Sequence, residues 1–318
     1  MRFVVVGAGA IGGVVGGRLV QAGHDVVLVA RGAHADVMAR GGLTLRSPEG
    51  DAIVEVQVAR AVGEIQWRPD DVVLLAVKSN DTVAVLEALE GVADPATAIV
   101  CLQNGVGNER EALRRFANVY GVCVMCPASY LQPGLVAASS SPITGIFDIG
   151  RYPTGRDETA AAIAEAFETA TFVSEVQPDI MRWKYAKLLM NLGNAVEAAM
   201  GPEGRFTEVA AEARREAVAC FRAAGIACAT QQEDRDRRGD LLQMQPIEGE
   251  ERGGGSSWQS LARGTGRIET DYLNGEIVLL GRLHGVPTPV NERLVRVAND
   301  LARAGSPPGS LTEADLLA

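Results

Sequence analysis

Four polar side chains interrupt an otherwise apolar stretch from Trp183 to Asn194, which reads WKYAKLLMNLGN. At about 100° per residue in a helix, Lys184, Lys187, Asn191 and Asn194 fall within an arc of roughly 80°. A lysine so placed can donate a proton to an oxygen that gains negative charge, and a neutral amide can hold a substrate without cancelling that charge. The stripe predicts a site at a cleft between domains, where either Lys187 or Lys184 could act as the acid. A solvated face of a surface helix is the plainer interpretation.

A glycine-rich loop near the start of the chain is the second chemical feature. It consists of Gly7, Ala8, Gly9, Ala10, Ile11 and Gly12. This G-x-G-x-x-G lies between a β-branched run and a helical stretch, and a second apolar run follows, so it predicts a dinucleotide-binding site. Gly7 permits the tight turn, Gly9 lets the backbone approach the pyrophosphate, and Gly12 lets the helix pack close to the strand. The alternative is a purely structural turn.

The residues after the second apolar run indicate which dinucleotide is bound. NAD-binding proteins usually place Asp or Glu there, on the ribose 2′-hydroxyl, whereas this chain has Ala30 and Arg31. An arginine can pair with a 2′-phosphate through its fork of donors. We therefore expect NADP(H) rather than NAD(H). The alternative is that Arg31 is only a surface residue that opens the next helix.

Two further loops follow apolar runs and contain polar residues. Lys78 follows DVVLLAV, and Gln103-Asn104-Gly105 follows AIVCL. Ligands of open parallel sheets bind outside the carboxyl ends of strands. Lys78 and Asn104 are therefore expected at the edge of the cofactor cleft.

The first half of the chain alternates short apolar runs with helical stretches, which predicts a parallel sheet covered on both faces. Strands are expected at residues 2–6, 25–30, 71–77, 98–102 and 119–125, and helices at residues 11–22, in the stretch ending at 90, and at 108–116. Residues 43–58 contain an alternating segment that suits a small hairpin. Residues 127–152 have Gly, Pro and Ser at intervals, which suits antiparallel hairpins or loops.

The second half, after Val176, is mostly helical. Helices are expected at residues 178–200, 204–224, 233–245, 265–284 and 289–304, with a loop at Gly253 to Gly255. The fold class is therefore α/β. We expect an N-terminal Rossmann-type doubly wound parallel sheet at residues 1–176 that binds NADP, followed by an all-helical C-terminal domain at residues 177–318.

The bulk composition limits the classes of partner. The 318 residues carry a net charge of −10 at pH 7, which argues against a nucleic-acid-binding surface. No apolar run reaches the length of about 20 residues that a membrane-spanning helix needs. The five cysteines include one close pair, CVMC, in an apolar run without a second pair or a histidine cluster, so no metal is expected and reduced thiols in the cytoplasm fit best. The three histidines, among them His34, lie near no metal-like cluster.

Taken together, the motifs GAGAIGG, VKS, QNG, W-x-x-x-K-L-x-x-N, the Ser256-Ser257 pair and IETDYLNG resemble those of the ketopantoate reductases (2-dehydropantoate 2-reductases) over nearly the whole chain. That resemblance implies reduction of a small-molecule 2-oxo acid with NADPH, on the route to pantothenate and coenzyme A. It also implies a homodimer formed through the helical domain.

The resemblance implies roles residue by residue. Lys187 corresponds to the family's general acid. Asn191, Ser257 and Glu269 correspond to positions that bind the substrate, the serine through its carboxylate and the glutamate through its terminal hydroxyl. The resemblance also implies that Asn194 binds the substrate and that Asn104 contacts both cofactor and substrate. It places Lys78 and Glu269 near the cofactor.

The chain departs from the family pattern around the expected substrate pocket. Asn194 lies three residues after Asn191, where four is common, and Trp183 lies four before Lys187, where two is usual. Trp258 stands where methionine is common, and the acidic residue usual shortly after is missing. Two alternatives therefore remain: a reductase of another 2-oxo acid or ketone, and a nucleotide-binding sensor without turnover.

Overall fold

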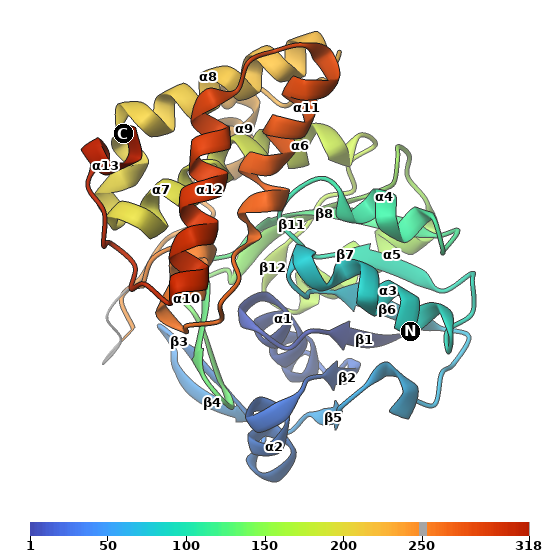
Figure 1. Ribbon diagram of the computed structural model, residues 1–318. Helices are drawn as coiled ribbons and strands as arrows, with labels where there is room; N and C mark the ends of the chain where they lie inside the picture. The colour runs from blue at the N-terminus through green and yellow to red at the C-terminus, as the bar shows by residue number, and fades with distance from the viewer. Residues whose placement is uncertain (248–252, 318) are drawn as a thin grey trace. The chain divides into compact units, whose positions relative to one another are not determined.

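The computed structural model describes residues 1–247 and 253–317 (Figure 1). The chain folds into two compact units. The first contains Met1–Gln103, Gly107–Lys184 and the segment that begins at Gln231. The second contains Asn104–Val106, Tyr185–Thr230 and the described residues from Gly253 onward. The first unit thus extends past the boundary expected at residue 176, and a segment of the helical half belongs to it.

The first unit is built on one sheet, which within the described residues has eight strands in the order β12-β11-β8-β7-β6-β1-β2-β5. Neighbouring strands are parallel, except for the antiparallel pair β11 and β8. The expected α/β class, with a mostly parallel sheet followed by a helical region, is confirmed. The strands are β1 (Arg2–Val6), β2 (Asp25–Val29), β5 (Gln57–Ala59), β6 (Asp71–Leu75), β7 (Ala98–Cys101), β8 (Val119–Met125), β11 (Gly145–Arg151) and β12 (Phe172–Val173).

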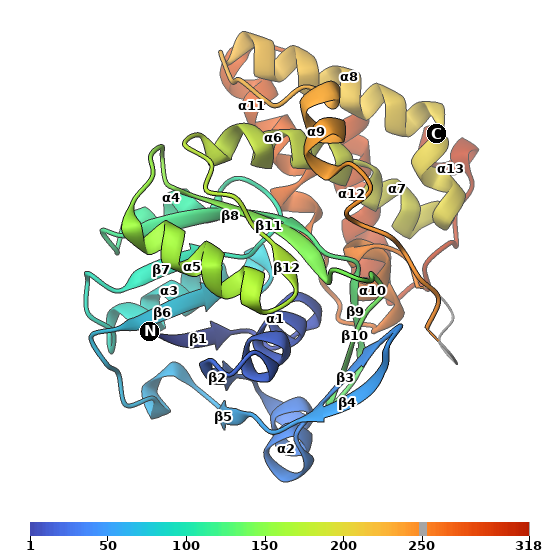
Figure 2. The ribbon, with the colours of Figure 1, turned by 180° about the vertical axis from the view of Figure 1, so that it is seen from behind.

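The sheet separates two apolar cores. Val5 and Leu28 face a core shared with α1 (Ala10–Gln21) and α5 (Glu158–Thr169), and Figure 2 shows α5 over the back of the sheet. Val4 and Val27 face a core shared with α3 (Thr82–Glu90) and α4 (Asn108–Leu113). Because both faces are covered, these strands read as continuous apolar runs instead of alternating ones.

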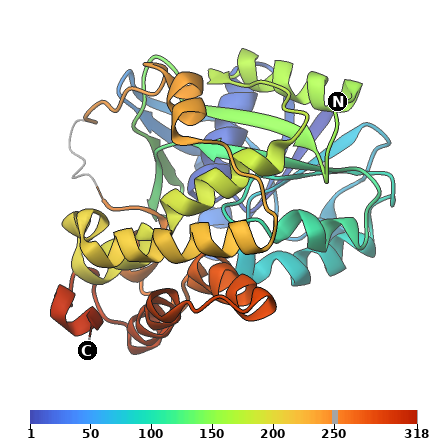
Figure 3. The same ribbon diagram turned by 90° about the horizontal axis from the view of Figure 1, so that it is seen from above.

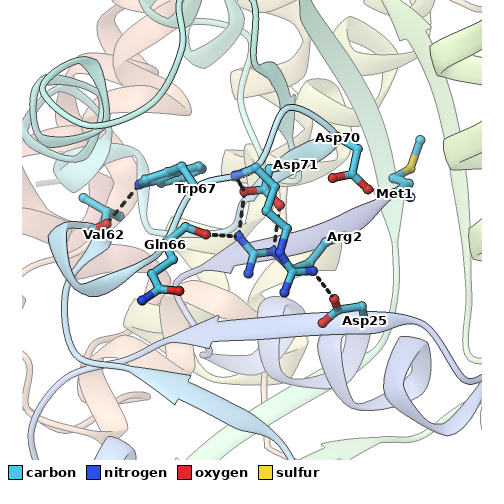
Figure 4. Close-up of polar contacts among 9 residues, drawn as sticks. Met1, Arg2, Asp25, Val62, Gln66, Trp67, Asp70 and Asp71 are labelled. Atoms are coloured by element: carbon cyan, nitrogen blue, oxygen red, sulfur yellow. Dashed lines mark hydrogen bonds and ion pairs between the residues drawn. The ribbon is translucent and has the colours of Figure 1, made fainter.

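A buried charged pair lies at the amino ends of the two central strands (Figure 4). Arg2 donates through two nitrogens to the two carboxylate oxygens of Asp71, at 2.7 Å each. Arg2 also donates to the Gln66 carbonyl, and the backbone N–H of Arg68 donates to Asp71. Arg2 and Asp71 are register partners at the start of β1 and β6, so this bidentate ion pair helps to fix how the two strands align. The loops that follow the other ends of β1 and β6 carry candidate site residues.

A smaller sheet in the same unit has the strand order β4-β3-β10-β9. Strands β3 (Leu43–Ser47) and β4 (Gly50–Val54) form the expected hairpin, and β9 (Ala128–Gln132) and β10 (Leu135–Ala138) form a second one. The hairpins join through the parallel pair β10 and β3. Helix α1 packs against β3, β9 and β10, so this sheet covers the helix that follows the glycine loop.

The described part of the second unit is helical, and α8, α11 and α12 pack against one another (Figure 3, yellow to red). The single helix expected at residues 178–200 is wrong: α6 ends at Asn191 and α7 begins at Gly193. The helix expected at 265–284 is likewise two elements, η4 and α11. Apart from α9 (Gln231–Arg238), which belongs to the first unit, the described elements from residue 180 onward are α6 (Ile180–Asn191), α7 (Gly193–Met200), η3 (Pro202–Phe206), α8 (Glu208–Ala223), α10 (Ser256–Ala262), η4 (Glu269–Tyr272), α11 (Asn274–His284), α12 (Pro289–Ala304) and α13 (Glu313–Leu317).

The helix expected at residues 233–245 is also shorter than predicted. Helix α9 (Gln231–Arg238) ends early, and Met244 instead forms an antiparallel bridge with Ser140. The buried pair of Arg237 with Asp148 holds this segment on the first unit. Within the described ranges, no helix has the length and apolar character needed to cross a bilayer.

Candidate active site

The candidate residues of the first unit follow strand ends that pair in register. Val6 pairs with Val29 and Leu75, and Leu75 pairs with Cys101. Since these four strands are parallel, the loops after β1, β2, β6 and β7 leave the sheet at one edge. Those loops carry the glycine run, Arg31, Lys78 and Gln103.

The glycine loop has the geometry of a phosphate cradle. Gly7 has φ +101°, and a Cβ at Gly12 would lie 1.9 Å from the Gly7 carbonyl oxygen, so no larger residue fits at either place. A Cβ at Gly9 would meet no described heavy atom within 4 Å, so the backbone there is open to a ligand. Gly9 caps α1, which has no acidic residue in its first turn to neutralise its amino end. The loop therefore fits a dinucleotide pyrophosphate.

Arg31 is exposed and immediately precedes α2 (Gly32–Gly41) as its N-cap residue. Ala30 is buried, and its N–H donates to the Ala59 carbonyl at the end of β5. The first side chain that can reach solvent beyond β2 is thus a guanidinium and not a carboxylate. This arrangement suits a phosphate better than a ribose hydroxyl.

Gln103 ties the loop after β7 to the loop after β6. Its side-chain amide donates to the Val77 carbonyl at 2.8 Å and to the Thr82 hydroxyl at 2.7 Å. Thr82 in turn donates to Asn108, which donates to Ser79. The backbone on either side of Lys78 is therefore held by the side chains of Gln103, in the loop after β7, and Asn108, in α4. The sequence predicted no role for Gln103, although it stands in the QNG motif.

Lys184 lies on α6 within the first unit and is buried there. Its side chain is 2% exposed, and its ammonium lies 2.6 Å from a carboxylate oxygen of Glu109, itself 0% exposed. The ammonium also donates to the Gln103 carbonyl at 2.9 Å and to the Val122 carbonyl at 3.3 Å. The ammonium therefore has a buried counter-charge and two carbonyl acceptors. The expectation that Lys184 could serve as the alternative acid is therefore not supported by its surroundings.

The five cysteines form no disulfide in the part of the chain that the structure describes, and no group of side chains there could hold a metal ion. Burial and the nearby Glu109 carboxylate raise the pKa of the Cys101 thiol well above its ordinary value. Cys123 donates to the Trp183 carbonyl and Cys126 to the Thr144 carbonyl, so the CVMC thiols point to different partners.

The rest of the lysine–asparagine stripe belongs to the second unit. Lys187 is half-buried on α6, and Asn191, one turn later, is 5% exposed. The Nδ2 of Asn191 has no hydrogen-bond partner among the residues that the structure describes. Asn194 is also buried, but its side-chain oxygen accepts from Arg205 at 2.8 Å. Of the two asparagines, only Asn191 thus has a buried donor that a ligand would satisfy.

The Ser256-Ser257 turn is anchored by a charged residue that the sequence did not suggest. Glu197 on α7 pairs with Arg205 and accepts from the Gly255 N–H at 3.1 Å. A Cβ at Gly255 would lie 2.5 Å from the Arg205 guanidinium, so the turn passes close over this pair. Ser257 is 2% exposed and lies in the first turn of α10. Glu197 and Arg205 therefore determine where that serine begins its helix.

Trp258 lies against the glycine run. A Cβ at Gly254 would be 2.5 Å from the indole ring, and one at Gly253 would be 2.9 Å from it. Side chains at these positions would displace the ring, which explains why glycines precede this tryptophan. The bulky residue that departs from the family pattern is therefore packed against its own loop.

Glu269 is 5% exposed and opens η4. Asn274, from the same IETDYLNG motif, is completely buried and donates to the Leu192 carbonyl at 3.2 Å and to Asn291 at 3.0 Å. Leu192 directly follows Asn191. Within the second unit, the hydrogen bond from Asn274 to Leu192 thus links the IETDYLNG motif to the end of α6.

Comparisons with known proteins agree with these motifs. The family model described as "Ketopantoate reductase PanE/ApbA" matches residues 3–153, and its C-terminal counterpart matches residues 179–302. A 2-dehydropantoate 2-reductase from Pyrococcus horikoshii is 30% identical over 299 residues, which cover 92% of this chain and 94% of the relative. A crystal structure of a PanE/ApbA family ketopantoate reductase from Ralstonia eutropha JMP134 matches with a TM-score of 0.79 at 28% identity, over 96% of this chain and 99% of the other.

One solved structure is similar in fold alone. The ternary structure of a D-mandelate dehydrogenase with NADH and anilino(oxo)acetate matches with a TM-score of 0.80 at 22% identity. It covers 96% of this chain, and the match includes 99% of the dehydrogenase. The same architecture is thus found in an enzyme named for a different hydroxy acid.

Proposed function

The chain belongs to the ketopantoate reductase family, and from that premise we propose that it reduces 2-dehydropantoate to pantoate with NADPH. This reaction would place it on the route to pantothenate and coenzyme A. The observation that carries the proposal is the buried, unpartnered amide of Asn191, one helical turn after Lys187. A buried donor without an acceptor is costly, so a substrate oxygen at this amide would offset that cost.

We assign the proton to Lys187. NADPH, when bound, would supply a hydride, and the carbonyl oxygen of the 2-oxo acid would gain negative charge. The Lys187 ammonium donates its proton to that oxygen and is left as a neutral amine, which solvent reprotonates. The alternative lysine on α6 already pairs with Glu109 and donates to two carbonyls, which supports this choice.

Recognition of the substrate falls to the other candidates of the second unit. Ser257 would bind the substrate carboxylate, and Glu269 would bind the terminal hydroxyl that distinguishes 2-dehydropantoate. Asn194 is already bonded to Arg205, so its contribution to substrate binding would be indirect. Asn191 and Ser257 supply neutral donors, which hold an anion without cancelling the charge of Lys187.

Recognition of the cofactor falls to the glycine run Gly7–Gly12, Arg31, Lys78 and Asn104. The open backbone at Gly9 would receive the pyrophosphate, and Arg31 would pair with the 2′-phosphate. Lys78 would add positive charge at the same edge of the sheet. This assignment favours NADPH over NADH.

A different 2-oxo acid or ketone is the second candidate substrate. Trp258, adjacent to Ser257, replaces the family's usual methionine, and Asn194 is engaged by Arg205. The fold shared with a protein named D-mandelate dehydrogenase is consistent with this second candidate. The reaction and the roles of Lys187 and Asn191 would be unchanged.

An absorbance assay at 340 nm with NADPH, 2-dehydropantoate and a panel of 2-oxo acids tests the proposal. Turnover of 2-dehydropantoate at about 1–10³ s⁻¹ is the expected result. Turnover restricted to other 2-oxo acids would favour the second candidate. Binding of NADPH without turnover of any compound would contradict both candidates and favour a sensor.

A further inference from the structure

Both ring nitrogens of His34 are bonded to backbone atoms of the first unit. His34 is 7% exposed and lies in the first turn of α2. Its Nε2 is 2.7 Å from the Ala8 carbonyl oxygen, within the glycine loop. The N–H of Gly134, in the turn between β9 and β10, donates to its Nδ1 at 2.8 Å. One side chain therefore connects the glycine loop, α2 and the smaller sheet.

The partners determine the protonation state of the ring. Gly134 can only donate, so Nδ1 must accept, and the Ala8 carbonyl can only accept, so Nε2 must carry the proton. The imidazole is thus neutral, with its proton on Nε2. Burial lowers the pKa of His34, which is consistent with the neutral form.

The turn that contacts Nδ1 is itself held in place. Gly134 has φ +80°, and a Cβ there would lie 2.2 Å from the side chain of Val37 on α2, so the turn approaches the helix more closely than any other residue permits. The Gly134 carbonyl accepts from the Thr44 N–H at 2.8 Å. The Tyr130 ring packs on the imidazole, with ring centres 4.6 Å apart. His34 is therefore oriented from the side opposite the glycine loop.

We propose that His34 is the positioning residue of the cofactor site. Ala8 stands between Gly7 and Gly9, two residues that add conformational freedom to the loop, so the loop needs an anchor from outside. His34 supplies that anchor from the helix whose N-cap residue is Arg31. It thereby fixes the pyrophosphate loop relative to the residue proposed for the 2′-phosphate.

This inference rests on the proposed function only in that the site binds a dinucleotide. It does not depend on the substrate. Because the pyrophosphate is common to both dinucleotides, loss of the Ala8 anchor must weaken NADPH and NADH alike, whereas loss of Arg31 must weaken only NADPH. A catalytic or metal-binding role is not supported, because both ring nitrogens are already bonded to backbone.

The test compares two conservative variants. His34→Gln retains a donor that can reach Ala8, and His34→Asn retains an acceptor near Gly134 but loses the donor to Ala8. We measure Kd for NADPH and for NADH by titration of cofactor fluorescence, together with kcat and the KM of the 2-oxo acid at saturating cofactor. Ser174→Ala is the stability control, since it removes a buried hydrogen bond to the Phe147 carbonyl in the same unit, away from the loop.

His34→Asn is expected to raise both Kd values about tenfold, the worth of roughly one hydrogen bond, and His34→Gln to keep them within about threefold. In both variants, kcat and the KM of the 2-oxo acid should change less than about twofold. If His34→Asn does not fold, His34→Phe fills the same space without either bond and should show the same loss. Equal Kd values for His34→Gln and His34→Asn would overturn the inference. So would a loss of cofactor affinity in His34→Asn that is no greater than in Ser174→Ala. A wild-type protein that binds neither dinucleotide would instead refute the proposed function.

Discussion

Replacement of Lys184 by methionine tests whether this lysine is a structural ion or an acid. Lys184 and Glu109 face each other at 2.6 Å with side chains 2% and 0% exposed. Methionine fills much of the same space but leaves the Glu109 carboxylate buried without a counter-charge. Removing one partner of a buried pair costs about 3–5 kcal/mol, because the remaining charge is uncompensated. Against a typical stability of about 5–15 kcal/mol, such a loss is easily measured.

The double variant Lys184→Met/Glu109→Gln separates the pair from its surroundings. With both charges removed, the main remaining cost is the loss of a donor to the Gln103 and Val122 carbonyls, about 1–3 kcal/mol. The double variant should therefore be more stable than either single variant. Urea unfolding followed by circular dichroism gives the free energies of unfolding, and the double-mutant cycle gives the coupling.

Activity of the folded variants completes the comparison. Lys187→Ala should lower kcat by about 10²–10⁴-fold with little change in stability, as for loss of a general acid. Lys184→Met, assayed below its unfolding transition, should keep kcat within about tenfold. An unchanged free energy of unfolding together with a loss of kcat above about 10²-fold in Lys184→Met would refute this reasoning and make Lys184 the acid.

Three further outcomes are expected. Arg31→Ala should raise the KM for NADPH by about tenfold or more and leave that for NADH nearly unchanged, since only NADPH has the 2′-phosphate; equal effects in steady-state assays would remove Arg31 from that role. Gly12→Ala should abolish dinucleotide binding in the fluorescence titration, because its Cβ would lie 1.9 Å from the Gly7 carbonyl oxygen. Asp157→Asn should flatten the acid limb of a plot of unfolding free energy against pH. Burial raises the pKa of Asp157, but a backbone N–H of α5 and Arg151 outweigh it and lower the pKa below 3.8. Its stabilisation is therefore complete above about pH 4 and is lost as pH falls through the lowered pKa, and an unchanged acid limb would contradict this origin.

The parallel sheet could be predicted because its signal is local. Strands buried on both faces need continuous apolar residues, and runs such as DVVLV in β2 have few other uses in a soluble fold. The glycine loop could also be predicted from sequence, since Gly7 and Gly12 lie where any side chain would collide with the backbone. Sequence alone sufficed wherever the constraint acts between neighbours in the chain.

The remaining features depend on partners that are distant in sequence. Helix α9 belongs to the first unit, where its Arg237 pairs with Asp148, and nothing near Arg237 in sequence indicates that partner. Likewise, Lys184 has the helical spacing of a stripe with Lys187, and only the position of Glu109 on α4 shows that its charge is already neutralised. Periodicity reports which residues share a face of a helix, but not what that face contacts.

Asn194, three residues after Asn191, lies in a separate helical segment. Helix α6 ends at Asn191 and α7 begins at Gly193. The side-chain oxygen of Asn194 accepts from Arg205, the residue that also pairs with Glu197. Since Glu197 accepts from the N–H that precedes the serine pair, the second asparagine acts on that turn through an arginine. Asn194 and the charged pair beside the serines thus belong to one cluster of polar contacts.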